Sequence, residues 1–598
     1  MDKIKSLTNK FMTTEKKISD VFYYSYTSLK PFYKLIILMI LILASLFLII
    51  YAWQLNKENM VLVASRGGRL NEGVIGSPSV INPLLAVSEA DRDLVSLIYS
   101  GLLKFDNQGN LTTDLAKSYQ ISEDGLEYSF TLKNNLTWHD GEKLTADDIV
   151  FTINKIKNPA LKSPKRINWE GIEIEKIDDK NIKFILIKPY APFIYNLTLG
   201  ILPEHLWKDI HAENLALNPL NLSPIGSGPF KIKNIKRNKS GVAEFYDLEP
   251  FENYALGEPK IALLRLRFFP NEDELIFAHN RKEIDSWHDF SLANNTTFNI
   301  NSQKKEYSGS LPRIFGVFLN QNQAEIFIYP EIRQALNLAT CRDIITNQIL
   351  EDGKKVTPID GLFPPGILNE DEELKNSWEK GLEEAQKILV ENSWSKNDET
   401  NVVSKSITDK DGRKKEISFS FTLMTSDSPE LKKTAEILKG CWEKVGAEVE
   451  IKIYESGRLN QDFIPGRKFD ALLFGLMVGK EPDPFAYWHS SQRLDPGLNI
   501  SSYANIKVDN LLEEARETID KDERFNIYEE INQIITTENP AIFLYSPKFS
   551  YFLPTNVKGV EFPRLFSPAE RFSGIHDWYI KTDKLWKIFA EPENIIKE

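Results

Sequence analysis

The sequence predicts a mixed α/β protein that is preceded by one membrane-spanning helix. The prediction rests on a strand–helix–strand pattern at residues 417–453, on alternating apolar and polar residues at 126–138, and on an uncharged apolar run at 35–53. The chain has 598 residues, of which 42% are hydrophobic and 11% aromatic. This length allows several domains, and this composition excludes a disordered chain.

The apolar run at residues 35–53 is the first expected element. It has 19 residues without a charge, close to the ~20 that a helix needs to cross a bilayer. The preceding residues 1–34 hold seven Lys and three acids. The positive-inside rule therefore places residues 1–34 in the cytoplasm and the body on the extracytoplasmic side.

A cleaved signal peptide is the competing interpretation of this run. A signal peptide normally has a shorter apolar region that ends in small residues, whereas this run ends in Tyr51, Ala52 and Trp53. We therefore expect an uncleaved, single-pass anchor that holds the body at the cell membrane, in the periplasm or at the cell surface.

The first part of the body is expected to alternate helices and strands. Ser88 and Thr145 each begin a helix, because an acid follows three residues later and apolar residues then recur on one face. Between these helices, residues 126–138 alternate as a half-buried strand does. Residues 392–411 are polar and predict an exposed excursion.

A parallel strand pair is expected further along the chain. Alternating residues at 417–423 are followed by a helix at 428–446 and by a second alternating stretch at 449–453. Two strands joined by a crossover helix lie parallel. Another buried strand is expected from Phe469, and the loop after it is a candidate wall of a ligand cleft, since ligands gather at the carboxyl ends of such strands.

Charge and motif content exclude several classes of function. The chain has 73 basic and 85 acidic residues, and this net charge of −12 disfavours a nucleic-acid partner. No GxxxxGK, HExxH or GxSxG motif occurs and the seven His are scattered, so we expect no catalysis, no metal and no cofactor. Cys341 and Cys441 lie in apolar helical stretches and are predicted to be buried free thiols.

Nine stretches, in a constant order, resemble the family 5 extracellular solute-binding proteins, which include dipeptide-, oligopeptide- and nickel-binding receptors of ABC importers. The longest is residues 111–153, with SEDGLEYSFTL, HDG and TADDIVF. The others are NPL at 82, ILPEHLW at 201, GSGPFKI at 226, NYALGEP at 253, FLNQN at 318, EIRQALNLA at 331, EPDP at 481 and YANIKVDNLLEEA at 503. The resemblance covers residues 63–586.

The resemblance implies a two-lobed, periplasmic-binding-protein-like fold of type II with a subdomain inserted in lobe I. The implied ranges are 63–309 for lobe I, 86–224 for its inserted subdomain, 310–545 for lobe II, and 546–598 for the return to lobe I and the C-terminal tail. The implied function is the capture of dipeptides or oligopeptides between the lobes by a monomer, which delivers them to an ABC permease with its ATPase. A metal chelate or a glycan as the solute, and a surface peptide sensor or chaperone without transport, stay open as alternatives.

The resemblance also implies a ligand site in the loop after the strand from Phe469. In peptide-binding members, an aspartate after a "GW" strand end pairs with the α-ammonium of the ligand, and aligning residues 475–476 with "GW" places Gly479 at that aspartate. Glu481 or Asp483 is expected to replace it, because a buried ammonium needs a carboxylate partner. The alternatives are that EPDP is only a rigid surface turn, and that Lys480 meets a ligand carboxylate. The loop residues assigned to the site are Met477, Gly479, Lys480, Glu481 and Asp483.

Five residues outside this stretch of the loop complete the predicted site. Trp138, Trp287 and Trp488 lie in family segments that approach the cleft, where aromatic walls suit varied side chains, and core packing is the alternative for each. Asn82 and Asn320 lie near the expected edge of lobe I and the first hinge crossing, where an amide could bond to a peptide backbone. A turn is the alternative role for Asn82.

Overall fold

The computed structural model describes residues 23, 27, 28, 30–106, 109–288, 304–349, 356–364, 368, 378–397, 400–408, 413–479, 482–562, 567–591 and 594–596. Contacts divide the chain into two compact units. The body is Arg66–Ile580, and the terminal unit is Met1–Ser65 together with Lys581–Glu598.

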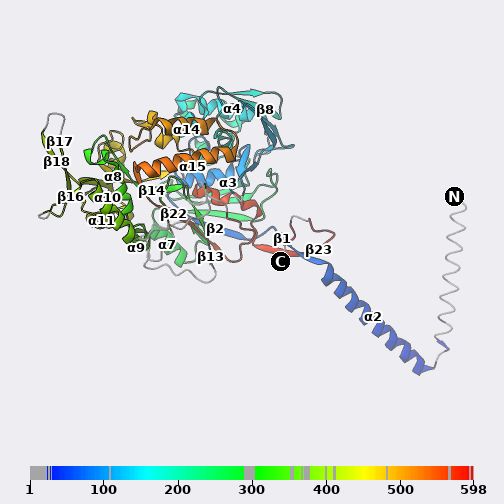
Figure 1. Ribbon diagram of the computed structural model, residues 1–598. Helices are drawn as coiled ribbons and strands as arrows, with labels where there is room; N and C mark the ends of the chain where they lie inside the picture. The colour runs from blue at the N-terminus through cyan, green and yellow to red at the C-terminus, as the bar shows by residue number, and fades with distance from the viewer. Residues whose placement is uncertain are drawn as a thin grey trace. The chain divides into compact units, whose positions relative to one another are not determined.

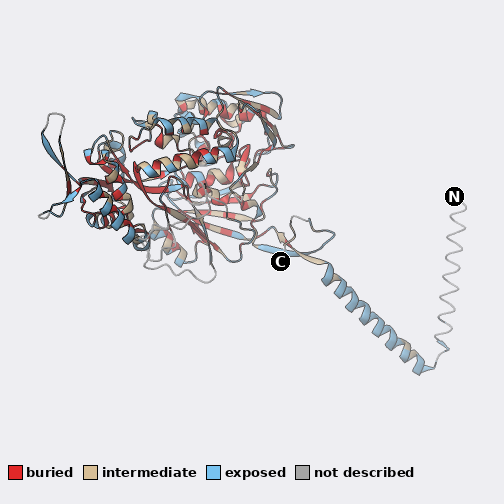
Figure 2. Ribbon diagram, in the orientation of Figure 1, coloured by how far each residue is buried: buried red, intermediate tan, exposed pale blue. Residues whose placement is uncertain are grey.

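The terminal unit contains a long helix and a two-stranded sheet (Figure 1). Helix α2 spans Pro31–Asn59, and none of these described residues is buried, so its ribbon is almost wholly pale blue in Figure 2. By length and composition α2 is able to cross a membrane, a property that it shares with signal sequences. Strand β1 (Met60–Ser65) follows directly and pairs antiparallel with β23 (Lys581–Trp586).

The body is built around a twelve-stranded sheet with the order β20-β19-β21-β14-β22-β12-β2-β11-β10-β9, in which β13 and β15 also pair with β22. The strands are β2 (Arg69–Ile75), β9 (Phe230–Arg237), β10 (Ala243–Pro250), β11 (Leu263–Phe269), β12 (Ser286–His288), β13 (Lys304–Ser310), β14 (Arg313–Leu319), β15 (Val356–Pro358), β19 (Ser420–Ser426), β20 (Glu448–Tyr454), β21 (Ala471–Met477) and β22 (Ala541–Pro554). Strand β22 runs through both halves of the sheet, because residues 541–545 pair with β14 and residues 548–554 pair with β13.

One half of the sheet, with β14 and β19–β21, carries helices on both faces. Successive residues of β14 point to opposite faces, so Phe315 packs in one core with α8, α9, α10 and α11, whereas Ile314 packs in another with α14 and α15. These helices are α8 (Pro330–Leu338), α9 (Arg342–Ile349), α10 (Trp378–Glu391), α11 (Pro429–Glu443), α14 (Ile506–Glu517) and α15 (Lys521–Glu538). Figure 1 shows α14 and α15 side by side. Three such layers are typical of an α/β domain.

The strand–helix–strand prediction is confirmed in this half. Strands β19 and β20 are parallel, with Leu423 opposite Ile451, and α11 connects them. The buried strand predicted from Phe469 is β21. The stretch at residues 392–411, predicted to be an exposed excursion, contains β16 (Ser395–Lys396) and β17 (Val403–Thr408). With β18 (Lys414–Ser418) these strands form a small sheet whose ribbon projects from the body in Figure 1.

The other half of the sheet shares a core with a smaller antiparallel sheet of order β5-β6-β8-β7. Its strands are β5 (Ala116–Ile121), β6 (Glu127–Leu132), β7 (Ile172–Lys176) and β8 (Asn181–Leu186). The strand predicted at 126–138 is confirmed only as β6, because the chain turns after Leu132. Helices α3 (Glu89–Ile98) and α4 (Ala146–Lys157) begin as predicted. Asp91 N donates to Ser88 Oγ over 3.1 Å, and Asp147 N donates to Thr145 Oγ1 over 3.3 Å.

The core residues of the two halves come from different parts of the chain. One large cluster draws on residues 70–311 and 549–578, and two clusters draw only on residues 314–545. A small fourth cluster around Trp287 falls within the first two ranges. The chain therefore passes from one set of cores to the other between residues 311 and 314, and returns between residues 545 and 549.

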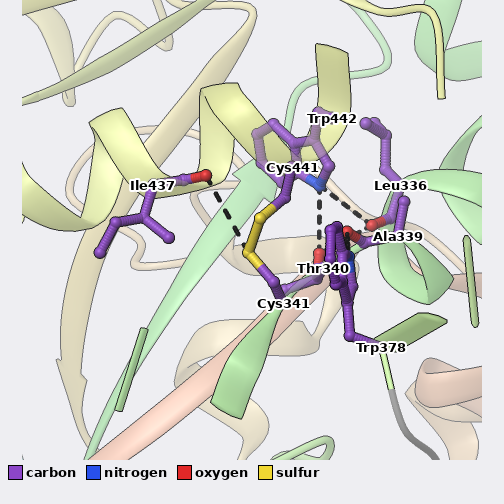
Figure 3. Close-up of a disulfide and its surroundings, with 8 residues drawn as sticks. All are labelled: Leu336, Ala339, Thr340, Cys341, Trp378, Ile437, Cys441 and Trp442. Atoms are coloured by element: carbon purple, nitrogen blue, oxygen red, sulfur yellow. Dashed lines mark hydrogen bonds between the residues drawn. A yellow bond between two sulfur atoms is a disulfide. The ribbon is translucent and has the colours of Figure 1, made fainter. Parts of the chain in front are cut away.

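Cys341 and Cys441 form a disulfide between the residue that precedes α9 and helix α11, so the prediction of two free thiols is wrong (Figure 3). Beside it, Trp442 Nε1 donates to Leu336 O and to Thr340 Oγ1, both over 3.1 Å. The predicted burial is correct, but 100 residues separate the cysteines and no local pattern shows that α9 packs on α11. A disulfide is typical of proteins of oxidising, extracytoplasmic compartments.

Candidate functional site

The loop after β21 leaves the carboxyl end of the strand, where the ligand wall is expected. Met477 ends β21 and is 44% exposed. Gly479 has a φ of 78°, a left-handed conformation that favours glycine. Lys480 and Glu481 lie outside the described residues. The backbone of this turn therefore favours a glycine at the position that aligns with the family's aspartate.

Asp483 already has a cationic partner. Arg516 of α14 donates to Asp483 Oδ2 from Nε over 2.8 Å and from Nη2 over 2.7 Å, and Phe485 N donates to Asp483 Oδ1 over 3.0 Å. The Arg516 guanidinium also lies 3.6 Å from the centre of the Phe485 ring. Because the Asp483 carboxylate neutralises Arg516, it is not available to a ligand in this conformation.

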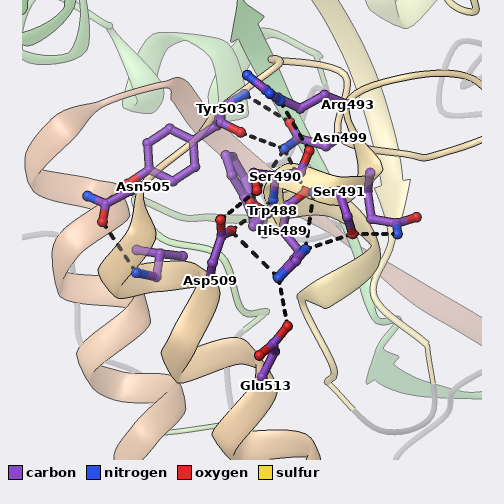
Figure 4. A network of polar contacts seen from close by, with 12 residues as sticks. Trp488, His489, Ser490, Ser491, Arg493, Asn499, Tyr503, Asn505, Asp509 and Glu513 are labelled. Atoms are coloured by element: carbon purple, nitrogen blue, oxygen red, sulfur yellow. Dashed lines mark hydrogen bonds and ion pairs between the residues drawn. The ribbon is translucent and has the colours of Figure 1, made fainter.

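Trp488 is a core residue at the end of α13 (Phe485–Trp488). It is 2% exposed, and its ring lies 6.0 Å from those of Tyr503 and Phe543. The chain beyond it is tied to α14 by the polar network in Figure 4, in which Ser490 N donates to Asp509 Oδ1 over 2.8 Å. These contacts fix the far end of the predicted loop.

Trp138 and Trp287 also have no exposed surface. Trp138 belongs to the large core cluster, and Trp287 packs in the small cluster, with its ring stacked 5.1 Å from that of Phe552. Core packing, the alternative for each tryptophan, therefore describes their contacts in this conformation.

The side chains of Asn82 and Asn320 stabilise turns by accepting hydrogen bonds from the backbone. Asn82 Oδ1 accepts from Leu84 N over 3.0 Å, and its Nδ2 donates to Asn221 Oδ1 over 3.1 Å. Asn320 Oδ1 accepts from Asn322 N over 3.1 Å. Asn82 has no exposed area and Asn320 is 1% exposed, so both amides are used within the protein.

Two cavities are lined by none of the predicted site residues. The larger, which we call the α3 cavity, has a volume of about 410 Å³. Its lining includes Arg92, Val95, Ser96 and Tyr99 from α3 or its end, Lys104, Phe105 and Asp114, Lys165 and Trp169, Tyr254, and Ala569, Glu570, Phe572 and Ser573. A volume of this size is typical of small-ligand pockets.

The α3 cavity contains buried polar atoms that lack a partner. Tyr99 OH and Ser573 Oγ have none among the described residues. Burial raises the pKa of Asp114 and lowers the pKa of Lys104, whose Nζ donates to Ser573 O over 2.7 Å. Buried polar groups are normally paired, so these atoms are suited to a polar ligand or to ordered water.

The second cavity, the β19 cavity, lies at the carboxyl ends of parallel strands. It has a volume of about 270 Å³ and is lined by Arg313, Phe315, Ser426, Ser428, Glu430, Leu431, Ser456, Leu459, Asn460, Phe474 and Gly475. Ser426 ends β19, and Arg313 begins β14 directly opposite Met477. A Cβ at Gly475 would lie 2.7 Å from the Phe315 ring, so this glycine allows the ring to pack on β21.

Glu430 of this cavity is a candidate that sequence reasoning missed. Ligands gather at the carboxyl ends of parallel strands, but the sequence prediction considered only the end of β21. The same rule holds at the end of β19, where Ser426 ends the strand, Ser428 precedes α11 and Glu430 lies in the first turn of α11.

Glu89 interacts electrostatically with one arginine from the lining of each cavity. Burial and Asp93 raise the pKa of this carboxyl in the first turn of α3, while several arginines, Arg92 and Arg313 among them, lower it.

A cluster of buried ion pairs stabilises η8 (Pro568–Phe572), a short helix that lines part of the α3 cavity. Arg571, in η8, lies 3.1 Å from Glu72 Oε1 and 2.5 Å from Asp93 Oδ2, and the three side chains have no exposed area. Ser286 and Tyr551 donate to the other oxygen of Glu72. Burial raises the pKa of Glu72 and Arg571 lowers it. The cluster therefore joins η8 to α3, β2, β12 and β22.

No group of three or more His, Cys, Asp or Glu side chains within the described part of the chain is placed to hold a metal ion. The two cavities instead offer apolar surface with a few charged groups. Such surfaces suit the reversible binding of an organic solute.

Comparison with known proteins gives consistent matches. Residues 110–495 match the family described as bacterial extracellular solute-binding proteins, family 5 middle. The oligopeptide-binding protein AppA of Bacillus subtilis is 29% identical over 526 residues, which are 86% of this chain and 92% of AppA. The structure of AppA in complex with a nonapeptide matches with a TM-score of 0.65 and 27% identity, over 87% of this chain and 100% of the chain in that structure.

Two further structures match over nearly the same range. The substrate-binding protein CtaP of Listeria monocytogenes has a TM-score of 0.72 and 25% identity, over 86% of this chain and 99% of CtaP. NikZ of Campylobacter jejuni, in complex with Ni(L-His), has a TM-score of 0.65 and 26% identity, over 86% of this chain and 99% of NikZ. The predicted resemblance and the periplasmic-binding-protein-like α/β fold are confirmed, and the chain belongs to the family 5 bacterial extracellular solute-binding proteins.

Proposed function

We propose that the protein is a membrane-anchored, extracytoplasmic receptor that captures peptides between two lobes and delivers them to the permease of an ABC importer. The similarity to AppA, which was solved with a nonapeptide, is the observation that carries the proposal. The two lobes are the halves with separate cores, and β22 passes between them as a hinge strand. Closure is then a shift toward a population that the solute stabilises by touching both lobes.

Helix α2 supports membrane attachment, and the disulfide supports an extracytoplasmic body. Residues 35–53 of α2 are uncharged, and the Lys-rich residues 1–34 favour a cytoplasmic N-terminus. The Cys341–Cys441 disulfide fits a body outside the cytoplasm. N-terminal sequencing of the mature protein should begin at or near Met1, and a start near residue 54 would mean a cleaved signal peptide.

We place the solute against the β19 cavity and the loop at residues 475–488 on one side, and against the α3 cavity on the other. The β19 cavity supports this placement because it combines the carboxyl ends of parallel strands with Arg313 and Glu430. Since Asp483 already pairs with Arg516, we assign the carboxylate for a ligand ammonium to Glu481.

Calorimetry with one peptide in its free and N-acetylated forms tests this assignment. Glu481→Gln should weaken only the free peptide, by about 2 to 5 kcal/mol if the ion pair is desolvated. Asp483→Asn is the matched control, because it removes a carboxylate from the same loop without removing the proposed partner. Equal binding of both peptides by the unmutated protein would exclude an ammonium site.

A metal chelate is the second candidate solute, because NikZ was solved with Ni(L-His) and is about as similar as AppA. The described residues place no cluster of metal ligands, so such a solute would be held through its organic ligand. Elemental analysis of the purified protein separates the candidates, since stoichiometric nickel without peptide would favour the chelate.

A further inference from the structure

The end of β23 is bonded to the last turn of helix α2. Trp586 Nε1 donates to Asn56 Oδ1 over 2.7 Å, and Lys587 N donates to Asn59 O over 2.8 Å. Both bonds lie within the terminal unit, as does the pairing of β1 with β23. A segment that lies more than 500 residues along the chain from α2 is therefore fixed beside the exit of this helix.

The chain turns at this point and exposes large apolar side chains. Phe589 N donates to Trp586 O over 2.8 Å and closes the turn. Ile588 is 77% and Phe589 73% exposed, and Leu585 and Trp586 are also exposed. We call residues 585–589 the apolar turn. Adjacent exposed apolar and aromatic side chains of this kind mark an interaction surface.

The position of the apolar turn along α2 indicates what covers it. The uncharged run of α2 ends at Trp53, and Asn56 and Asn59 follow it by three and six residues. At 1.5 Å per residue, they lie about 5 and 9 Å beyond the hydrocarbon edge. The headgroup layer of one leaflet is about 5 to 8 Å thick. The bond to Asn56 therefore holds Trp586 within this layer, where tryptophan is enriched in membrane proteins, and the bond to Asn59 holds Lys587 at its outer edge.

We propose that the apolar turn is seated in the headgroup region of the extracytoplasmic leaflet, as a second membrane contact beside α2. This inference rests on the proposed anchoring by α2. Ile588 and Phe589 supply the apolar contact, and the flanking Lys584 and Lys587, both exposed, suit the lipid phosphates. The contact would fix the β1–β23 sheet at the membrane surface and leave the anchor less free to rotate.

Site-directed fluorescence in the full chain tests the proposal. The two native cysteines form a disulfide, so one introduced cysteine carries one environment-sensitive dye. The dye is placed at Phe589→Cys, at Leu48→Cys within α2, and at Leu217→Cys, which is 87% exposed in the body. Each protein is reconstituted in phosphatidylcholine nanodiscs with and without lipids that carry a nitroxide near the headgroup.

We expect the nitroxide lipids to remove most of the emission of the dye at residue 589, while the dye at residue 217 keeps its emission. Quenching at residue 48 without quenching at residue 589 would overturn the inference and leave the anchor intact. No quenching at residue 48 would overturn the proposed anchoring and the inference with it. If the dye at residue 589 entered an apolar environment only after a permease was added, the inference would also be overturned, because the turn would then bind protein and not lipid.

Discussion

The substitution Arg571→Met tests the buried ion cluster that holds η8 to α3. Arg571, Glu72 and Asp93 have no exposed side-chain area, so the change leaves two buried carboxylates without their cation. Ser286 and Tyr551 still donate hydrogen bonds to Glu72, so the expected loss of stability is that of one broken buried ion pair. The free energy of unfolding should fall by about 3 to 5 kcal/mol, a large part of the roughly 5 to 15 kcal/mol of a typical domain.

The pH dependence of this loss has a defined sign. Burial already raises the pKa of Glu72, and Arg571 opposes this rise. Without Arg571 the pKa of Glu72 rises further in the folded state. A carboxyl whose folded pKa is raised favours the folded state while it is protonated, and this contribution is lost as the pH rises through the folded pKa. The variant should therefore be closer in stability to the unmutated protein near pH 5 than at pH 7.

The assay is urea unfolding of the full chain in mild detergent, followed by tryptophan fluorescence at pH 5 and pH 7. Arg281→Met is the matched control, because Arg281 is 60% exposed and pairs with Glu283 over 2.7 Å. An exposed pair is worth at most about 1 kcal/mol. A loss for Arg571→Met no larger than that of the control, or a loss that is equal at both pH values, would refute the reasoning.

Three further predictions concern the lobe with β14 and β19–β21. Replacing both Cys341 and Cys441 by Ser should lower the melting temperature, because a disulfide that closes about 100 residues is worth up to about 5 kcal/mol; an unchanged transition in calorimetry would contradict this. Gly475→Ala should weaken peptide binding in titration calorimetry, because its Cβ would lie 2.7 Å from the Phe315 ring, and unaltered affinity would remove Gly475 from the site. Trp488→Ala should cost about 3 to 5 kcal/mol in urea unfolding, whereas lost affinity at full stability would make Trp488 a ligand contact.

Patterns of neighbouring residues in the sequence were sufficient to predict much of the fold. The starts of α3 and α4 follow from Ser88 and Thr145 with an acid three residues later, and both caps are formed. The parallel pair β19–β20 follows from two alternating stretches around a helix. These elements are decided by residues within a few positions of one another, which is why the sequence predicts them.

The site was harder to predict because its residues depend on partners far along the chain. Asp483 was a sound candidate by its position, but Arg516, 33 residues later, pairs with it. Trp138 looked suitable for an aromatic wall, yet it is wholly buried in the core. The pairing of Cys341 with Cys441 likewise depends on the packing of α9 on α11.

The central claim is that the body encloses a peptide. Mass spectrometry of the purified protein under native conditions, followed by denaturation and sequencing of any released solute, tests it most directly. We predict a mass increase that disappears on denaturation and is accounted for by one or more peptides. A bound saccharide or nickel complex, or a solute-free protein that binds no member of a mixed peptide library in calorimetry, would contradict the claim.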